Sequence, residues 1–434
     1  MRSSLPKVLH AVGGRPMLDW AIAAAEGAGA VRIVVVVGPH SPLVAKHAQA
    51  RLGQDAIAVQ AEALGTAHAV RAAEDALHGF EGDVCVLYAD TPRITARNLL
   101  ALRAARTRAQ ALLLAFEAAN PTGYGRLVLD AGGALVRVVE ENDANPAERA
   151  IKLCNSGVIL APSAALWPLL ARIGNANAKG EFYLTDLVGL LHAAGLRVES
   201  VSADEHEVLG VNSREQLAQA EAAFQQAART EALVSGVTLI DPATTFFSYD
   251  TVLEQDVVVE PNVWFGPGVR VGAGSRIRAC SHLEGAEVGP GCEVGPFARL
   301  RPGAVLAQMA KVGNFVEIKN ARLGEGAKAN HLSYLGDAEI GARANIGAGV
   351  ITCNYDGFFK YRTEIGEGAF IGSNVSLVAP VRVGVHGYVA SGSVITNEVP
   401  AAALAVARSR QVNKPDWAQA FRQEALARKA AESA

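Results

Sequence analysis

Residues 258–275 read VVEPNV-WFGPGV-RVGAGS, so an aliphatic residue, a small residue and a turn recur with a period of six. The period returns in VGPGCE-VGPFAR-LRPGAV at residues 288–305 and in IGEGAF-IGSNVS-LVAPVR-VGVHGY at residues 365–388. Six residues are too few for a helical repeat, whereas a parallel β-helix needs one short strand and one tight turn per repeat. The pattern therefore predicts a parallel β-helix between about residues 258 and 396, with three strands and about 18 residues in each coil.

The first half of the chain has a different pattern. Apolar β-rich runs, such as VRIVVVVG at 31–38 and DVCVLYAD at 83–90, alternate with helical segments. This alternation is typical of an α/β domain whose mostly parallel sheet is covered on both faces. An Ala-, Gln- and Glu-rich segment then predicts one long linking helix. We expect a first domain at 1–212, the linker helix at 213–235, the β-helix domain at 236–414 and a terminal helix or tail at 415–434.

The composition excludes several classes of function. The chain has 434 residues, of which 50% are hydrophobic and 19% charged, and a formal net charge of −3. Such a small charge gives no general attraction to nucleic acid or to an anionic membrane, and no apolar run of about 18 residues predicts a membrane span. The five cysteines lack metal-ligand spacing, and we interpret them as reduced thiols of a cytoplasmic protein. Because the net charge is slightly negative, an anionic ligand must be bound by a few lysine or arginine side chains at its site.

Polar residues follow the predicted strands of the first half. Asp90 comes directly after an apolar strand, at the edge where open α/β sheets bind ligands, so it is either a Mg²⁺ ligand or a turn residue. Gln60 ends another strand, and Gly65 and Thr66 open a helix whose free N–H groups suit a base or a phosphate. The glycine-punctuated loop 121–126 is either a cover for a sugar or an ordinary hairpin loop.

Two places in the second half interrupt the repeat, namely residues 318–334 and the loop 352–364. Inserted loops of this kind are usually functional. Arg301, Lys319 and Lys360 add cations at intervals of about one coil, which suggests an anion such as a sugar phosphate.

His331 lies where the repeat asks for a small or aliphatic residue. It is either a surface histidine or the general base that takes a proton from an attacking amine, and the nearby cations favour the base. Glu317, one coil earlier, orients the imidazole, holds the amine of a substrate or is simply a solvated carboxylate.

The order of the segments SLPKVL, QAEALGTAHA, YADTP, PTGYGR, VVEENDA, CNSGV, GEFYLTD and GVNSR, followed by the coils, points to one family. Over almost its whole length the chain resembles the bifunctional N-acetylglucosamine-1-phosphate uridylyltransferases and glucosamine-1-phosphate acetyltransferases. The resemblance implies a Rossmann-like α/β nucleotidyltransferase domain and a left-handed parallel β-helix. It also implies a cytoplasmic homotrimer that acetylates glucosamine 1-phosphate with acetyl-CoA. The same enzyme then combines N-acetylglucosamine 1-phosphate with UTP, giving UDP-N-acetylglucosamine and pyrophosphate.

The resemblance implies a residue set for each ligand. It assigns Mg²⁺ to Asp90 and Asn212, and catalysis of acetyl transfer to His331. The nucleotide and its sugar are assigned to Lys7, Gln60, Gly65, Thr66, Tyr88, Ala89, Asp90, Gly125, Glu140, Asn155 and Asn212, with Thr185 on the sugar side. Glucosamine phosphate is assigned to Arg301, Lys319, Tyr334, Asn345 and Lys360. Acetyl-CoA is assigned to Ala348, Asn354, Tyr355, Ser373, Ser391 and Arg408, with an oxyanion donor near Ala348.

The chain departs from this family at its first residues. The family opens with a strand and a loop of the form L-x-x-G-x-G-T-R-M, and Met1 stands at the last position of that signature. Absence of a central strand would expose two strand edges and remove a phosphate cradle. We therefore expect an N-terminally truncated first domain with poor or absent uridylyl transfer in the sequence as given. Ala89 and Arg93 also differ from the Gly and the aliphatic residue of the family.

Other functional classes remain open at this point. The chain is alternatively an acetyltransferase only, or a regulatory scaffold whose first domain binds nucleotide and whose β-helix assembles subunits. A β-helical metalloenzyme would need three histidines on one metal. His282, His331 and His386 are too far apart along the coils for that site.

Overall fold

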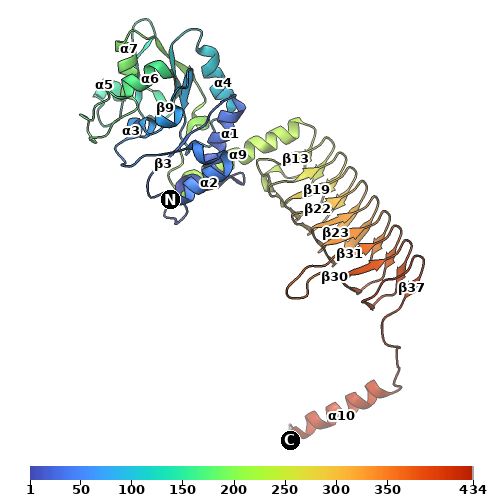
Figure 1. The fold of residues 1–434 in the computed structure, drawn as a ribbon. Coiled ribbons are helices and arrows are strands. Elements are labelled where there is room, and N and C mark those ends of the chain that lie inside the picture. The colour runs from blue at the N-terminus through green and yellow to red at the C-terminus, as the bar shows by residue number, and fades with distance from the viewer. Residues whose placement is uncertain (433–434) are drawn as a thin grey trace. The chain divides into compact units, whose positions relative to one another are not determined.

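The computed structural model describes residues 1–432. The chain divides into two compact units, Met1–Ala228 and Arg229–Ala434, and the boundary falls within helix α9 (Arg214–Val234) (Figure 1). This helix is the one that the sequence predicts between the two halves. No helix within residues 1–432 is both long enough and apolar enough to cross a membrane.

The first unit is built on a six-stranded sheet. Its order is β10 (Val198–Ser202), β6 (Ala111–Glu117), β9 (Leu153–Pro162), β7 (Arg126–Leu129) and β8 (Leu135–Val139), and β5 (Asp83–Val86) pairs with the last residues of β9. Only β10 and β6 are parallel, because β9 runs antiparallel to β5, β6 and β7. The prediction of a mostly parallel sheet is therefore wrong. The physical reason is that β9 runs opposite to the three strands beside it, while β7 and β8 form a hairpin, and antiparallel neighbours need no helical crossover.

A separate two-stranded parallel sheet pairs β3 (Val35–Val37) with β4 (Ile57–Val59). Within the described residues, β3 has a hydrogen-bonded strand on one side only, and so has β5. β4, β8 and β10 likewise have one hydrogen-bonded partner strand each. A short hairpin of β1 (Ala11–Val12) and β2 (Arg15–Pro16) follows the 3₁₀ turn η1 (Lys7–Leu9).

The helices of the first unit are α1 (Met17–Gly27), α2 (Pro42–Leu52), α3 (Thr66–Arg71), α4 (Ala96–Ala105), α5 (Pro146–Arg149), α6 (Ser163–Leu170), α7 (Asp186–Ala193) and α8 (Glu205–Val208). Among them α4 covers one face of the large sheet and α6 and α7 cover the other, whereas α2 packs against β3 and β4. Successive residues of β6 point to opposite faces, as strand geometry requires. Leu113 packs into a core with α6 and α7, whereas Leu112 and Leu114 pack into a core with α4.

The second unit is a parallel β-helix of three sheets (Figure 1). The ten-stranded sheet contains β11 (Thr238–Leu239), β14 (Val258–Val259), β17 (Arg276–Ile277), β20 (Glu293–Val294), β23 (Lys311–Asn314), β26 (Lys328–His331), β29 (Asn345–Ile346), β32 (Phe370–Ile371), β35 (Tyr388–Val389) and β37 (Leu404–Ala405). The nine-stranded sheet contains β12 (Thr245–Phe246), β15 (Val263–Phe265), β18 (His282–Leu283), β21 (Arg299–Leu300), β24 (Glu317–Lys319), β27 (Tyr334–Gly336), β30 (Ile351–Cys353), β33 (Ser376–Val378) and β36 (Val394–Ile395). The eight-stranded sheet contains β13 (Val252–Leu253), β16 (Arg270–Val271), β19 (Ala286–Val288), β22 (Ala304–Leu306), β25 (Ala321–Leu323), β28 (Ala338–Ile340), β31 (Thr363–Ile365) and β34 (Val381–Val383).

The aliphatic position of each hexapeptide points inward and forms a ladder. Val259, Ile277, Val294 and Val312 are register partners in successive coils, and all are buried. Burying each such side chain contributes about 1.5–3 kcal/mol relative to leaving it in water. The predicted parallel β-helix is confirmed.

The coils continue in register through residues 318–334, so the predicted interruption there is wrong. Arg299 pairs with Glu317, 18 positions later, but Glu317 pairs with Tyr334, only 17 positions later. One residue fewer shifts the hexapeptide phase without breaking the sheet. The second predicted interruption is confirmed, because the chain leaves the coils after β30 and returns at β31.

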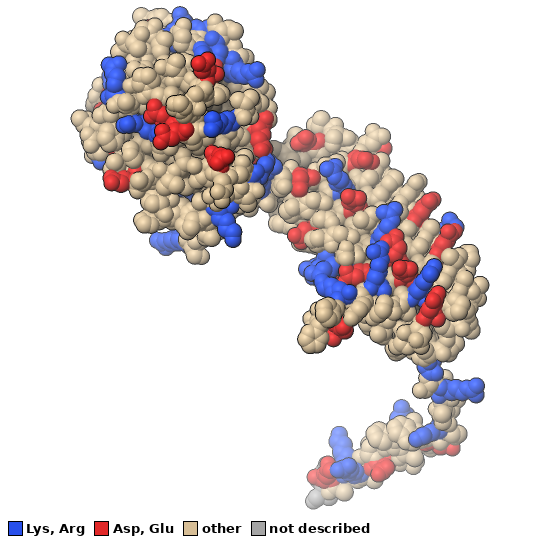
Figure 2. All heavy atoms as spheres, in the orientation of Figure 1, with Lys and Arg blue, Asp and Glu red and all other residues tan. Residues whose placement is uncertain are grey.

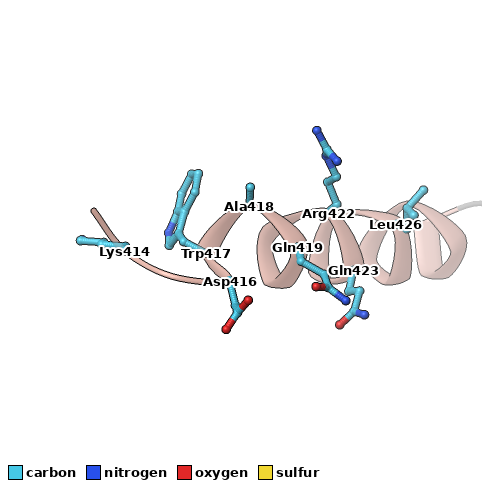
Figure 3. A pocket seen from close by; sticks show the side chains of 8 residues that line it. All are labelled: Lys414, Asp416, Trp417, Ala418, Gln419, Arg422, Gln423 and Leu426. Atoms are coloured by element: carbon cyan, nitrogen blue, oxygen red, sulfur yellow. The ribbon is translucent and has the colours of Figure 1, made fainter. Parts of the chain in front are cut away.

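Helix α10 (Trp417–Glu432) follows the coils and buries none of its residues. Trp417 and Phe421 stack on it with ring centroids 5.2 Å apart. The residues that line a hollow here lie between positions 414 and 426, on this helix and the turn before it (Figure 3).

Two candidate active sites

Three predicted ligand residues meet in the first unit. Lys7 lies in η1, Asp90 follows β5, and Asn212 precedes α9. The Lys7 Nζ donates to Asp90 Oδ2 at 2.6 Å and to Asn212 Oδ1 at 2.8 Å. The backbone N–H of Val211 donates to the Asp90 carbonyl at 2.8 Å, which joins the two segments.

These oxygens can hold a divalent cation. A carboxylate and an amide oxygen that converge on one ammonium are also within reach of one metal ion, and Mg²⁺ typically takes one or two protein oxygens and completes its shell with phosphates and water. Residues 1–432 contain no group of three or more His, Cys, Asp or Glu side chains that could hold a metal. The Asp90 and Asn212 pair offers two oxygens, which matches the one or two protein ligands that Mg²⁺ typically takes.

The predicted nucleotide residues Gln60, Gly65 and Thr66 lie together. Gln60 Nε2 donates to the Gly65 carbonyl at 3.1 Å, and Thr66 Oγ1 accepts from the Leu184 N–H at 2.9 Å. Gly65 has φ 118°, and a Cβ there would lie 2.5 Å from the Phe182 carbonyl oxygen. Only glycine fits this position.

The predicted sugar residues are also brought together. Thr185 Oγ1 donates to Glu140 Oε1 at 3.0 Å, and a Cβ on Gly125 would lie 3.5 Å from that oxygen and 3.7 Å from Asn155 Cβ. Tyr88 connects this group to the nucleotide side. Its burial, followed by the Glu140 charge, raises the pKa of Tyr88 to about 12, against the effect of a hydrogen bond with Thr66.

The predicted nucleotide residue Ala89 lies in a less polar place than Tyr88 and Asp90, because it packs against the hydrophobic cluster that includes Leu18 and Val37.

Arg126 is a residue that the sequence analysis did not single out. Its guanidinium is buried, donates to the Tyr124 carbonyl and pairs with Glu141 Oε2 at 2.5 Å. This hydrogen bond lowers the pKa of Glu141 and fixes the predicted sugar loop. The sequence could have indicated this role, because Arg126 begins the otherwise apolar strand β7.

Three cations converge in the second unit. Arg301 follows β21, Lys319 ends the adjacent strand β24, and Lys360 lies in the loop between β30 and β31. Hydrogen bonding and repulsion from the neighbouring Lys360, followed by repulsion from Arg301, lower the pKa of Lys319. Like charges held this close favour an anionic ligand between them. Glu317 pairs with Arg301 at 2.8 Å and with Arg299 at 3.6 Å.

His331 lies exposed at the end of β26. Its Nδ1 is 2.8 Å from Oδ1 of Asn314, which ends β23 in the preceding coil. The side chain that contacts the imidazole is therefore Asn314, whereas Glu317 is engaged by arginines. The sequence missed Asn314 because its partner lies one shortened coil away.

The predicted acetyl-CoA residues follow His331 along one corner of the prism. In successive coils, Lys328, Asn345, Phe370 and Tyr388 are register partners. Three positions after each of them lie His331, Ala348, Ser373 and Ser391, which therefore occupy matching positions. Ser391 Oγ accepts from the Ser373 N–H at 3.1 Å. Arg408 lies at the end of this column, with its Cδ 3.8 Å from a Cβ built on Gly392.

Two predicted glucosamine-phosphate residues lie on different sheets. Asn345 lies on β29 of the same sheet as His331, whereas Tyr334 lies beside Glu317 on the nine-stranded sheet.

Within one chain, the cation cluster and the His331 column lie at opposite edges of the nine-stranded sheet. His331 precedes β27 and Lys319 ends β24. The predicted residues Asn354 and Tyr355 are on the side of the cations. The Asn354 amide is buried against Asp337, and the Tyr355 hydroxyl donates to the Gly357 carbonyl at 2.5 Å.

Asp337 anchors the loop that carries Lys360. Its carboxylate accepts from Asn320 Nδ2 at 2.5 Å and from Asn354 Nδ2, and its carbonyl accepts from the Thr363 N–H at 3.1 Å. We predict that Asp337→Ala speeds chymotrypsin cleavage at the exposed Phe358 by about tenfold, because an unsatisfied buried amide costs about 1–3 kcal/mol.

The matched control is Glu325→Ala, which changes an exposed carboxylate in a turn of the same prism. Equal cleavage rates for both variants and the native chain would show that Asp337 does not hold the loop.

Comparison with known proteins gives consistent matches. Residues 1–176 match the family model of the MobA-like NTP transferase domain. The Bifunctional protein GlmU of Dinoroseobacter shibae is 56% identical over 436 residues, which cover 100% of this chain and 96% of the relative. That of Maricaulis maris is 58% identical over 431 residues, which cover 99% and 95%. A solved UDP-glucose pyrophosphorylase complexed with UDP-glucose has a TM-score of 0.42 and 18% identity, covering 52% of this chain and 92% of that one.

Proposed function

The chain belongs to the family of bifunctional GlmU proteins, and we propose that it catalyses acetyl transfer in its second unit and uridylyl transfer in its first. Acetyl-CoA and glucosamine 1-phosphate give N-acetylglucosamine 1-phosphate, which then reacts with UTP to give UDP-N-acetylglucosamine and pyrophosphate. The identity of 56% and 58% to GlmU proteins over nearly full length supports this assignment. The observation that carries it is the convergence of Arg301, Lys319 and Lys360 on a prism that also presents His331.

In acetyl transfer, the sugar amine attacks the thioester carbonyl, so a C–N bond forms and the C–S bond breaks. We assign His331 as the base that takes the amine proton, which the departing CoA sulfur finally receives. Arg301, Lys319 and Lys360 hold the phosphate, and the neighbouring Tyr334 and Asn345 hold the sugar. Acetyl-CoA lies along Ala348, Ser373, Ser391 and Arg408, with Asn354 and Tyr355 at the loop and an N–H near Ala348 facing the oxyanion.

In uridylyl transfer, a phosphate oxygen of the sugar attacks the α-phosphorus of UTP, and pyrophosphate leaves. We assign Asp90 and Asn212 as ligands of Mg²⁺, which neutralises the phosphate charge that moves in this step. Lys7 adds a second positive charge. Gln60, Gly65, Thr66, Ala89 and Tyr88 contact the nucleotide, and Gly125, Glu140, Asn155 and Thr185 contact the sugar.

We place the enzyme in the cytoplasm, where acetyl-CoA and UTP are available. All five cysteines are free thiols, which supports this location.

Acetyl transfer is tested by the release of free CoA that depends on glucosamine 1-phosphate. We expect His331→Ala to lower kcat by about 10²–10⁴-fold, as loss of a general base does. His282→Ala is the control, because His282 is another exposed histidine of the prism and stacks on Trp264. No sugar-dependent release by the native chain would refute the assignment for this unit.

The metal assignment is tested by Mn²⁺ binding without nucleotide, measured by electron paramagnetic resonance. Because the Lys7 ammonium engages both proposed ligand oxygens, Lys7→Met should tighten Mn²⁺ binding several-fold, and Asp90→Ala should abolish it. Lys46→Met, at an exposed helical position, should change nothing. A Lys7→Met chain with native Mn²⁺ affinity contradicts this arrangement.

We propose that the active form is a homotrimer, and an apolar corner ridge supports it. Phe297, Phe315 and Leu332 are 51%, 56% and 59% exposed and have positive φ in successive coils. The two phenylalanine rings stack at 5.3 Å. Bulky residues rarely take such φ values, and exposed apolar ridges usually mark contacts with another protein. By contrast, acidic and basic side chains alternate on the visible face of the prism (Figure 2).

The trimer is tested by sedimentation. The native chain should have about three times the mass of one 45.2 kDa chain, and Phe315→Glu should give monomers because it buries a charge at the ridge. Met309→Glu is the control, since Met309 is a 51% exposed corner residue with positive φ outside the ridge. Dissociation by the Met309 change alone would disprove the role of the ridge.

A further inference from the structure

The pairing of neighbouring coils places Asn314 directly beside His331. The two residues are register partners at the ends of β23 and β26, and their side chains meet at 2.8 Å. The Asn314 carbonyl also accepts from the Leu332 N–H at 3.0 Å, so backbone and side chain hold the same turn. A Cβ on Gly313 would overlap the Asn330 backbone, and this glycine allows the close approach.

The chemistry of this contact defines the protonation of the ring. An amide oxygen only accepts hydrogen bonds, so the Nδ1 that faces Asn314 Oδ1 must carry hydrogen. A neutral imidazole has one N–H, and its lone pair is then on Nε2. The backbone carbonyl of His331 accepts from Ser333 Oγ at 2.8 Å and constrains the residue from the other side.

The partner is neutral, unlike the carboxylate that often orients a catalytic histidine. Glu317 is engaged by Arg299 and Arg301, so no carboxylate is bonded to the imidazole within the described residues. The other charged residues of the two strands, Lys311 and Lys328, are at their opposite ends, and β29 carries none. A neutral acceptor fixes the tautomer without stabilising the imidazolium.

We propose that Asn314 is the positioning residue for acetyl transfer, holding His331 in the Nδ1–H tautomer with Nε2 as the base. This inference rests on the proposed acetyl transfer. Nε2 takes the amine proton as the C–N bond forms, and it returns the proton to the CoA sulfur as the C–S bond breaks. Asn314 itself touches no substrate in this step.

Kinetics with two variants test the role. Asn314→Leu removes the acceptor at similar size and should lower kcat by about 10–100-fold, as for other groups that orient a catalytic ligand, with both KM values within about twofold. Asn314→Asp keeps the oxygen and adds a charge that stabilises the imidazolium. Its rate should reach half-maximum at a pH about one unit higher, and its kcat should recover towards the native value above that pH.

A readout without turnover separates this inference from the proposed function. In the full chain with ¹⁵N-labelled histidine, the His331 signals, identified with His331→Ala, should show a protonated Nδ1 and an unprotonated Nε2. Asn314→Leu should lose that preference while its thermal unfolding midpoint stays native. A native-like spectrum and kcat for Asn314→Leu would overturn the proposal. An inactive native chain with the expected spectrum would instead refute the acetyl-transfer assignment.

Discussion

The stacking of buried aliphatic side chains inside the prism is the constraint on which the second unit depends. Because Val259, Ile277, Val294 and Val312 occupy one inward ladder, every outward residue has a fixed neighbour one coil away. Polar side chains therefore align in columns along the prism. The residues that we propose for acetyl transfer, the cation cluster and the column that begins at His331, include such columns.

The first unit uses a different constraint. Its mixed sheet brings the chain after β5 beside the segment before α9, and one backbone hydrogen bond, from Val211 to Asp90, joins them. Lys7, from the start of the chain, donates hydrogen bonds to the side chains of both Asp90 and Asn212. Each unit thus brings together a group of polar residues of its own, and we propose a separate reaction for each.

Local periodicity predicted the β-helix and the loop after β30, because a six-residue pattern is visible without knowing any long-range contact. It did not predict that residues 318–334 stay in register, since coils of 17 instead of 18 residues look like an interruption. Asn314 was missed for the same reason. Local periodicity also could not predict which strands pair in the first sheet, because β9 pairs with three strands that are distant in sequence. The motif residues were nevertheless predicted, and Lys7, Asp90 and Asn212 meet in the structure, whereas the cation cluster and His331 lie at opposite edges of one sheet.

The central claim, two independent sites linked by a free intermediate, is tested most directly by mixing two inactive variants. Asp90→Ala and His331→Ala are each incubated with glucosamine 1-phosphate, acetyl-CoA, UTP and Mg²⁺, and UDP-N-acetylglucosamine is quantified by chromatography. Neither variant alone should make the product, whereas their mixture should, because one chain supplies N-acetylglucosamine 1-phosphate to the other. Product from either variant alone, or none from a mixture whose native control is active, would contradict this account.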